Sequence, residues 1–251
     1  MILDINDITF SYKSRAVIEE ISFSVREGEL VAILGRNGAG KTTLLKCLNR
    51  ILTPKTGTVL VEGLDTRTMR PLQMARTIGW VPQQAEAVMM TVYDVVLLGR
   101  KPHFIWSPAN EDHQMVEQAL TTVGIEHLAL RSADELSGGE LQLVQIARAL
   151  AQDPRIILFD EPTSSLDIHN ELRLMQTIRT VIHQSKRSAL IAVHDLNLAL
   201  RFSDAFLLLK EGRIFAAGGR EIITEATIRE VYDIEVRVIE VEGSPLVIPV
   251  Q

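Results

Sequence analysis

Hydrophobic residues in the first part of the chain alternate with polar residues in short runs separated by polar turns. The segments DITFSY, at 7–12, and EISFSVREGELVAIL, at 20–34, follow this pattern. Alternation with a period of two is typical of strands that are buried on one face only. We therefore predict an antiparallel sheet at the start of the chain.

The later part of the chain has a different pattern. Continuous β-rich runs occur at RIILFD (155–160), SALIAVHD (188–195) and DAFLLLK (204–210), and a helical pattern, NELRLMQTIRTVIHQ, fills 170–184. Buried strands that alternate with helices are typical of βαβ units and of a parallel sheet covered on both faces. The pattern predicts an α/β core with a mostly parallel sheet.

Between these two parts, residues 87–136 are helix-like and contain no strong run of a buried strand. Gly124 follows the periodic segment DHQMVEQALTTVG as a C-terminal cap, and we interpret the whole piece as an inserted helical subdomain. In TEATIREVY, near the end of the chain, Thr227 and Glu230 fit a capping box for a short helix. We predict one domain over 1–251, and its parts are a core with the antiparallel sheet (1–86 and 137–215), the helical subdomain (87–136) and a C-terminal appendage (216–251).

Composition narrows the class of protein. The 251 residues are 46% hydrophobic, which is enough for a sizeable core, and the net charge of −6 does not predict a broad basic face for nucleic acid. The single cysteine, Cys47, excludes an internal disulfide and is interpreted as a small core residue. The N-terminus does not look like a secretory signal, and no apolar run is long enough to cross a bilayer, so we expect any membrane role to depend on a partner.

Candidate chemistry begins at GRNGAGKT, residues 35–42, which matches G-x-x-x-x-G-K-[ST]. The apolar strand LVAIL precedes it, and a helical pattern follows from Leu44 to Leu52, where Thr-Pro stops it. Glycines allow backbone N–H groups to surround phosphate oxygens, and the helix N-terminus adds positive charge. Lys41 is then placed to bind the β- and γ-phosphates, and the Thr42 hydroxyl to join the shell of Mg²⁺. The expected phosphate-binding residues are Gly35, Arg36, Asn37, Gly38, Ala39, Gly40, Lys41, Thr42 and Thr43.

The run IILFDEP, at 156–162, ends a predicted buried strand with two acids. Two carboxylates at such a position are costly without a cation or a chemical role. Asp160 suits the Mg²⁺ shell, and Glu161 suits a group that polarises the water attacking a γ-phosphate. The alternative is an acid pair that caps a helix after the strand.

With the segment LSGGE, at 136–140, the chain resembles the ATP-binding subunits of ABC transporters. The resemblance covers nearly the whole chain and depends on motifs in the family's order. They are Tyr12, the glycine-rich loop at 35–42, Gln83 in VPQ, LSGGE, IILFDE, SSLD at 164–167, and His194 in VHD.

The resemblance implies a role for each of these residues. Tyr12 would stack on adenine, Gln83 would contact Mg²⁺ and the attacking water, and His194 would bind the γ-phosphate and help to hold the water and Glu161. The segment Ser137, Gly138, Gly139, Glu140 would close over the ATP of an opposing copy, with Asp167 at the seam of this homodimer. Lys41, Gln83, Glu161 and His194 would form the catalytic set, and the cofactors would be ATP and Mg²⁺.

The sequence differs from the commonest family pattern at three positions. Arg36 stands where proline is frequent, Leu141 where glutamine or arginine is frequent, and Ser165 where alanine is usual. None of these differences removes a group that has been assigned to the chemistry.

The segments TVYDVVLLGRKPH, at 91–103, and TEATIREVYDIEVRVIE, at 224–240, resemble the ATPases of importers for iron-siderophore complexes, haem and cobalamin. The resemblance implies membrane permease subunits, an indirect link to a substrate-binding protein, and a peripheral place on the cytoplasmic face of the membrane. Within the first segment, GRKPH is interpreted either as a solvated basic loop or as a docking edge for the permease. Three alternatives stay open, which are an importer for another substrate such as a metal ion, a soluble ABC ATPase, and a metabolic kinase.

Overall fold

The computed structural model describes residues 1–13, 15–84, 87–164, 166–241 and 244–250. Ser165, one of the three departures from the family pattern, lies outside the described residues. Among the helices of the described residues, none combines the length and apolar character needed to cross a membrane.

A six-stranded sheet forms the centre of the molecule, with the strand order β10-β9-β3-β8-β7-β6. The neighbouring strands from β9 to β6 are parallel, and β10 pairs with β9 in antiparallel orientation. Every residue of β3, β7 and β8 is buried, as expected of strands covered on both faces. The predicted α/β core is confirmed. The strands are β3 (Leu30–Leu34), β6 (Ile78–Val81), β7 (Ile156–Asp160), β8 (Ser188–Ala192), β9 (Ala205–Lys210) and β10 (Arg213–Gly218).

A second sheet contains the N-terminal strands in the order β2-β1-β4-β5. All three of its pairings are antiparallel, which confirms the prediction for the start of the chain. Leu3, Ile5 and Ile8 of this sheet are buried together with Leu44 and Leu45 of the following helix, so the sheet shares a core with that helix. The strands are β1 (Leu3–Tyr12), β2 (Arg15–Val25), β4 (Thr56–Val61) and β5 (Leu64–Asp65).

The helix after the glycine-rich loop, α1 (Lys41–Leu48), ends four residues before the predicted stop. Arg50 has a positive φ of 56°, which breaks the helical path. Its guanidinium donates hydrogen bonds to the carbonyl oxygens of Thr66, at 2.8 Å, and Met69, at 2.9 Å. The predicted helix after the glycines is confirmed, but its end was predicted too late, because these acceptors lie 16 and 19 residues further along the chain. Ile51, which lies within the predicted helical pattern of Leu44 to Leu52, is exposed.

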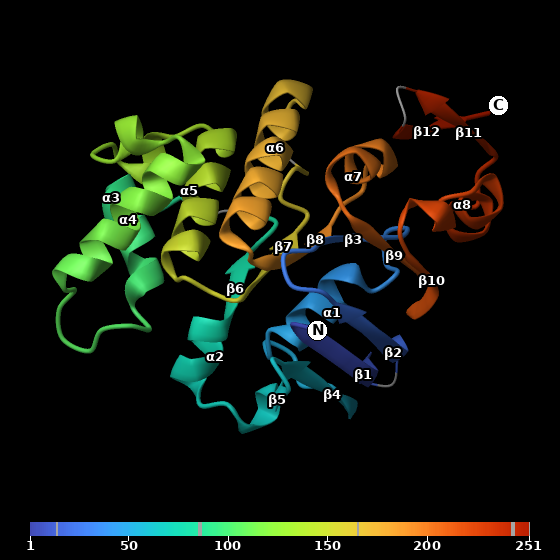
Figure 1. Ribbon diagram of the computed structural model, residues 1–251, viewed down its shortest axis with the longest axis horizontal. Coiled ribbons are helices and arrows are strands. Elements are labelled where there is room, and N and C mark those ends of the chain that lie inside the picture. The colour runs from blue at the N-terminus through green and yellow to red at the C-terminus, as the bar shows by residue number, and fades with distance from the viewer. Residues whose placement is uncertain (14, 85–86, 165, 242–243, 251) are drawn as a thin grey trace.

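The inserted piece is helical, as predicted. It contains α3 (Val92–Leu97) and α4 (Asn110–Val123), and both pack against α5 (Gly138–Ala151), which begins at the LSGGE segment. Figure 1 shows these three helices grouped at one end of the molecule. Gly124 ends α4 with a φ of 77°, which confirms the predicted C-terminal cap.

The basic segment GRKPH does not form a uniformly solvated loop. The Arg100 side chain is buried and forms an ion pair with Asp112, with 2.9 Å between Nε and Oδ1. The His103 ring lies 2.9 Å from the carbonyl oxygen of Gln152. The solvated-loop interpretation is therefore wrong for Arg100, which joins α4 to its neighbours, and the docking edge for the permease stays a prediction.

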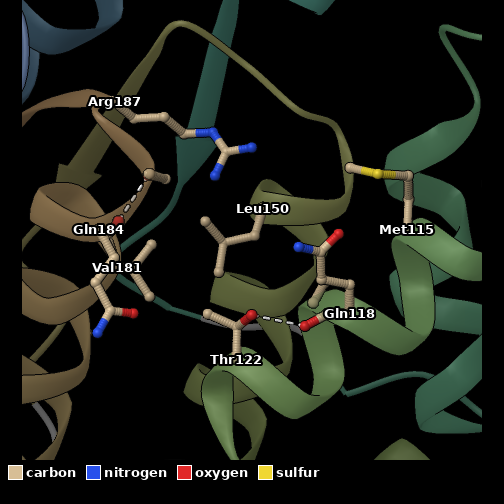
Figure 2. Close-up of a pocket in the computed structure, with 9 residues that line it drawn as sticks. Met115, Gln118, Thr122, Leu150, Val181, Gln184 and Arg187 are labelled. Atoms are coloured by element: carbon tan, nitrogen blue, oxygen red, sulfur yellow. Dashed lines mark hydrogen bonds between the residues drawn. The ribbon is translucent and has the colours of Figure 1, made fainter.

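A hollow of about 190 Å³ lies where the helical piece faces α6 (Ile168–Ser185). Figure 2 shows Met115, Gln118 and Thr122 of α4 on one side of it and Val181 and Gln184 of α6 on the other. Leu150 of α5 also lines the hollow, as does Arg187, which follows α6. The helical piece and α6 therefore face each other across a gap, and α5 forms part of its wall.

The C-terminal segment forms small elements at the opposite end of the molecule from α4 (Figure 1). They are α8 (Glu225–Tyr232), β11 (Val236–Val241) and β12 (Ser244–Pro249). The predicted capping box is wrong in register. Thr224 is the N-cap of α8 and accepts from the N–H of Thr227, while Glu230 forms an ion pair with Lys210.

The remaining elements are short. Two further helices are α2 (Pro71–Thr77) and α7 (Leu196–Phe202). Single 3₁₀ turns occur at Thr66–Thr68, Leu98–Arg100, Glu126–Leu128, Ala133–Glu135 and Arg220–Ile222.

Candidate active site

The glycine-rich loop joins the C-terminal end of β3 to the N-terminus of α1. Gly35 has a φ of 149°, and a Cβ placed on it would lie 2.4 Å from the carbonyl oxygen of Leu209. Gly40 has a φ of 103°, and its Cβ would lie 2.7 Å from Cγ2 of Ile18. Both positions therefore require glycine, because conformation and space exclude a side chain there.

A cavity of about 380 Å³ opens above this loop. Five segments of the chain meet there, namely the loop with the start of α1, one residue of β2, and the segments that follow β6, β7 and β8. The carboxyl ends of parallel strands are the usual place for a binding crevice in such sheets. The residues that line it are Val17, Asn37, Gly38, Gly40, Lys41, Thr42, Thr43, Gln83, Glu161 and His194.

Lys41 provides a buried positive charge at the floor of the cavity. Lys41 is only 4% exposed, and its Nζ donates a 2.9 Å hydrogen bond to the carbonyl oxygen of Gly35. Burial lowers the pKa of Lys41, and the carboxylates of Glu161 and Asp160 oppose this shift. The N-terminus of α1 adds partial positive charge at the same place, which favours an anion in the cavity.

Thr42 and Asp160 form a second polar pair beside Lys41. The Thr42 hydroxyl donates to Oδ1 of Asp160 at 2.7 Å. The pKa of Asp160 is raised, because the effect of burial outweighs the opposing effect of the hydrogen bond from the Thr42 hydroxyl. A buried carboxylate with this shift would be stabilised by a nearby cation.

Glu161 receives three side chains from different segments. Its Oε2 accepts a hydrogen bond from Gln83 Nε2 at 2.9 Å and lies 2.6 Å from His194 Nε2, and its Oε1 lies 3.6 Å from Lys41 Nζ. The backbone at Glu161 has a φ of 48°, a conformation that non-glycine residues rarely adopt and that is common at functional sites. The arrangement presents one carboxylate, fixed from three sides, to the cavity.

The predicted residues Tyr12 and Arg36 lie outside the lining of this cavity, within the residues that the structure describes. The Tyr12 side chain is half exposed and packs edge-on against Phe10, with 4.8 Å between ring centroids. Arg36 points toward Asp233, with 3.5 Å between NH1 and Oδ2.

The LSGGE segment is likewise separate from the cavity of its own chain. Ser137 is the N-cap of α5, and its hydroxyl donates to Oε2 of Glu140 at 2.6 Å. A Cβ placed on Gly138 would meet nothing within 4 Å, while Gly139 faces Asn170. Asp167 caps α6 by accepting from the N–H of Asn170 at 2.9 Å.

Three further residues contact the site without having been predicted. Val17 of β2 lines the cavity. The hydroxyl oxygen of Ser164 accepts a 3.4 Å hydrogen bond from Gln83 Nε2. The Tyr232 hydroxyl accepts a 3.0 Å hydrogen bond from the N–H of Gly35. Ser164 and Tyr232 stand in the quoted segments SSLD and TEATIREVYDIEVRVIE, which assigned them no role, and no local signal indicated Val17.

Comparison with known proteins gives consistent matches. The family model described as ABC transporter matches residues 18–164. An uncharacterized ABC transporter ATP-binding protein of Methanocaldococcus jannaschii is 48% identical over 250 residues, which cover 100% of this chain and 98% of the relative. A petrobactin import ATP-binding protein of Bacillus anthracis is 34% identical over 253 residues, with 98% and 93% covered.

A solved structure agrees with the sequence matches. A transporter in an inward-facing conformation, described as of the metal-chelate type, superposes with a TM-score of 0.85 and is 29% identical. The match covers 99% of this chain and 97% of the other. With the family model matching more than half of the chain, these similarities show that the chain belongs to the ABC transporter family, as one of its ATP-binding subunits.

Proposed function

We propose that this chain binds and hydrolyses ATP to drive the import of a metal chelate, of the iron-siderophore, haem or cobalamin class, through partner membrane subunits. The observation that carries the enzymatic part is the convergence of Lys41, Gln83 and His194 on the Glu161 carboxylate beside the glycine-rich loop. The similarity to a metal-chelate type transporter and to a petrobactin import protein supports the cargo class and the direction.

The triphosphate would lie over the loop, where backbone N–H groups and the Lys41 ammonium neutralise its charge. Thr42 and Asp160 fit Mg²⁺, because this ion prefers oxygen ligands and takes few from the protein. The raised pKa of Asp160 supports this assignment, since a cation would offset the burial that causes it. When bound, the ion would neutralise charge on the phosphate oxygens.

The Glu161 carboxylate would accept a hydrogen bond from the water that attacks the γ-phosphate. Glu161 would therefore be the general base of the reaction. Gln83 and His194 would hold the carboxylate in place and contact the water and the γ-phosphate. Water as the acceptor of the phosphoryl group yields ADP and inorganic phosphate. A metabolic kinase would instead transfer that group to a small molecule, which distinguishes the two classes.

Two copies of the chain would act together. Ser137, Gly138, Gly139 and Glu140 lie outside the lining of their own cavity in the described part of the chain, which supports a role toward the nucleotide of a second copy. Asp167, exposed at the start of α6, would lie at the seam of this homodimer. Tyr12 would stack on adenine. We place the dimer on the cytoplasmic face of the membrane against permease subunits, which receive cargo from a substrate-binding protein.

The enzymatic part is tested with purified protein. Wild-type chain should release inorganic phosphate from ATP without forming a phosphorylated small molecule. Glu161→Gln should keep ATP binding and lower the turnover rate by about 10² to 10⁴, because it removes general-base assistance. Lys41→Ala should weaken nucleotide binding in a direct titration. Near-normal turnover of Glu161→Gln would remove the assignment of the base.

Dimerisation and transport need their own measurements. With ATP, Glu161→Gln should sediment as a dimer, and adding Ser137→Arg should keep it a monomer by blocking closure. In cells of the source organism, deletion of the gene should lower uptake of one labelled chelate among ferric siderophores, haem and cobalamin. Normal uptake of all three would leave the ATPase assignment intact and overturn the proposed cargo class.

A further inference from the structure

The C-terminal appendage contacts the glycine-rich loop, although 197 positions separate the two residues involved. The Tyr232 hydroxyl, at the last residue of α8, accepts a hydrogen bond of 3.0 Å from the N–H of Gly35. Gly35 is the first residue of the loop. A residue to which the sequence motifs assigned no role therefore makes a direct polar contact with the loop that we assign to the triphosphate.

This hydrogen bond is one of three contacts that fix the backbone of Gly35. The carbonyl oxygen of the same residue accepts from Lys41 Nζ at 2.9 Å. Its Cα lies so close to the carbonyl of Leu209 that even a Cβ would not fit. The backbone of Gly35 is therefore held from both its N–H and its carbonyl and is packed against β9, so its orientation cannot change without breaking one of these contacts.

The helix that carries Tyr232 is packed firmly against β9. Ile228 and Val231 of α8 are buried in the large core that also contains Phe206 and Leu208 of β9. Glu230 of the same helix forms an ion pair with Lys210 at the end of β9. The hydroxyl thus comes from a helix attached to the strand that already contacts Gly35.

A second contact joins the same two segments. Arg36 and Asp233 form an ion pair of 3.5 Å, with side chains that are 60% and 87% exposed. Such exposed pairs contribute little by themselves. The pair joins the residue after Gly35 to the residue after α8.

We propose that Tyr232 is a positioning residue that presets the glycine-rich loop for the triphosphate, so that the C-terminal appendage contributes to nucleotide affinity. The proposal rests on the assignment of this loop to ATP. A loop whose first peptide is already fixed loses less conformational freedom when the nucleotide binds. Burial raises the pKa of Tyr232 to about 12, so the hydroxyl stays uncharged at physiological pH.

The test is Tyr232→Phe in the full chain, which removes the hydroxyl and keeps the ring. The Kd for ATP should rise about two- to tenfold, the usual effect of losing one intramolecular hydrogen bond. KM for ATP should rise by a similar factor, and kcat at saturating ATP should change less than twofold, roughly, because the groups around Glu161 are unchanged. A role in folding alone would not produce this split between KM and kcat.

Tyr93→Phe is the matched control. The Tyr93 hydroxyl also forms a hydrogen bond within the protein, 2.7 Å from Nδ1 of His113, but it belongs to the helical piece and not to the cavity. This variant should bind ATP as the wild type does. Wild-type affinity in Tyr232→Phe, or an equal loss in Tyr93→Phe, would overturn the positioning role. Failure of the wild-type chain to bind ATP would instead refute the proposed function.

Discussion

The buried ion pair of Arg100 and Asp112 allows a quantitative prediction about how the helical piece is held. Arg100 donates from Nε to Oδ1 of Asp112 and from NH1 to the carbonyl oxygen of Ala151, both at 2.9 Å. Oδ2 of Asp112 accepts from the N–H of Ala109 at 2.9 Å, at the start of α4. One guanidinium therefore links the beginning of α4 to the end of α5, the helix that starts at the LSGGE segment.

We consider Arg100→Met, which keeps most of the side-chain volume and removes the charge. The change leaves the Asp112 carboxylate and the Ala151 carbonyl without the guanidinium, in a place where both charged side chains are no more than 7% exposed. Breaking a buried pair from one side costs about 3 to 5 kcal/mol. For a chain of this size, about 2 to 4 °C of Tm are lost per kcal/mol, so Tm should fall by roughly 6 to 20 °C.

The pH dependence of this effect has a definite sign. Burial raises the pKa of Asp112, but the N–H of Ala109 and the Arg100 guanidinium outweigh it, and the net shift is downward. A lowered pKa in the folded state contributes stability above the pKa of the unfolded chain, and this contribution is lost as pH falls through the folded value. The difference in Tm between wild type and Arg100→Met should therefore narrow in acid.

Thermal unfolding followed by circular dichroism measures the effect. Arg67→Met is the control, because Arg67 forms a comparable pair with Asp65 but its side chain is 61% exposed, and this variant should leave Tm nearly unchanged. Adding Asp112→Asn to Arg100→Met should recover part of the loss, since it removes the unpaired charge. Equal destabilisation by Arg100→Met and Arg67→Met would refute the reasoning from burial.

Three further outcomes follow from the site and its core. Gly40→Ala should weaken ATP binding by at least about tenfold in a titration, since its Cβ would strike Ile18. The control is Gly28→Ala, whose Cβ would meet nothing within 4 Å and which should lower stability without changing ATP affinity. Equal ATP affinities of the two variants would contradict this. Burial raises the pKa of Cys47 to about 12, so iodoacetamide at pH 8 should label it only after unfolding in urea, as mass spectrometry can show. Asp160→Asn should raise the Mg²⁺ concentration for half-maximal hydrolysis at fixed ATP, and an unchanged requirement would exclude Asp160 from the ion's shell.

Much of the fold could be predicted because its signals are local. The strands β7, β8 and β9 are short continuous apolar runs, and burial on both faces gives them that composition. The end of α1 could not be predicted in this way. The apolar spacing continues through Ile51, but Arg50 leaves the helix to bind carbonyls of the loop at Thr66 and Met69.

The residues of the site could likewise be predicted from local motifs, whereas their contacts depend on parts of the chain that are distant in sequence. Gln83, Glu161 and His194 each follow a strand of the parallel sheet, and each was identified from its own short motif. Their contact depends on β6, β7 and β8 being neighbours in the sheet. The sequence pattern predicts β7 and β8 without their order, and it does not predict β6. The bond of Tyr232 to Gly35 depends on α8 packing beside β9, which no motif specifies.

The capping box of the LSGGE segment affects the anion site that we propose there. In the single chain, the Ser137 hydroxyl and N–H both donate to the Glu140 carboxylate, and the hydrogen bond from this hydroxyl lowers the pKa of Glu140. These donors at the N-terminus of α5 are therefore already occupied by a negative charge from their own helix. In the proposed dimer, a phosphate of the second copy's nucleotide would have to compete with that charge, and the loss of the bonds to Glu140 would offset part of the bonds gained. On this proposal, the cap would make closure of the dimer weaker than the donors alone would allow, so that less binding free energy would oppose separation once the γ-phosphate has been cleaved.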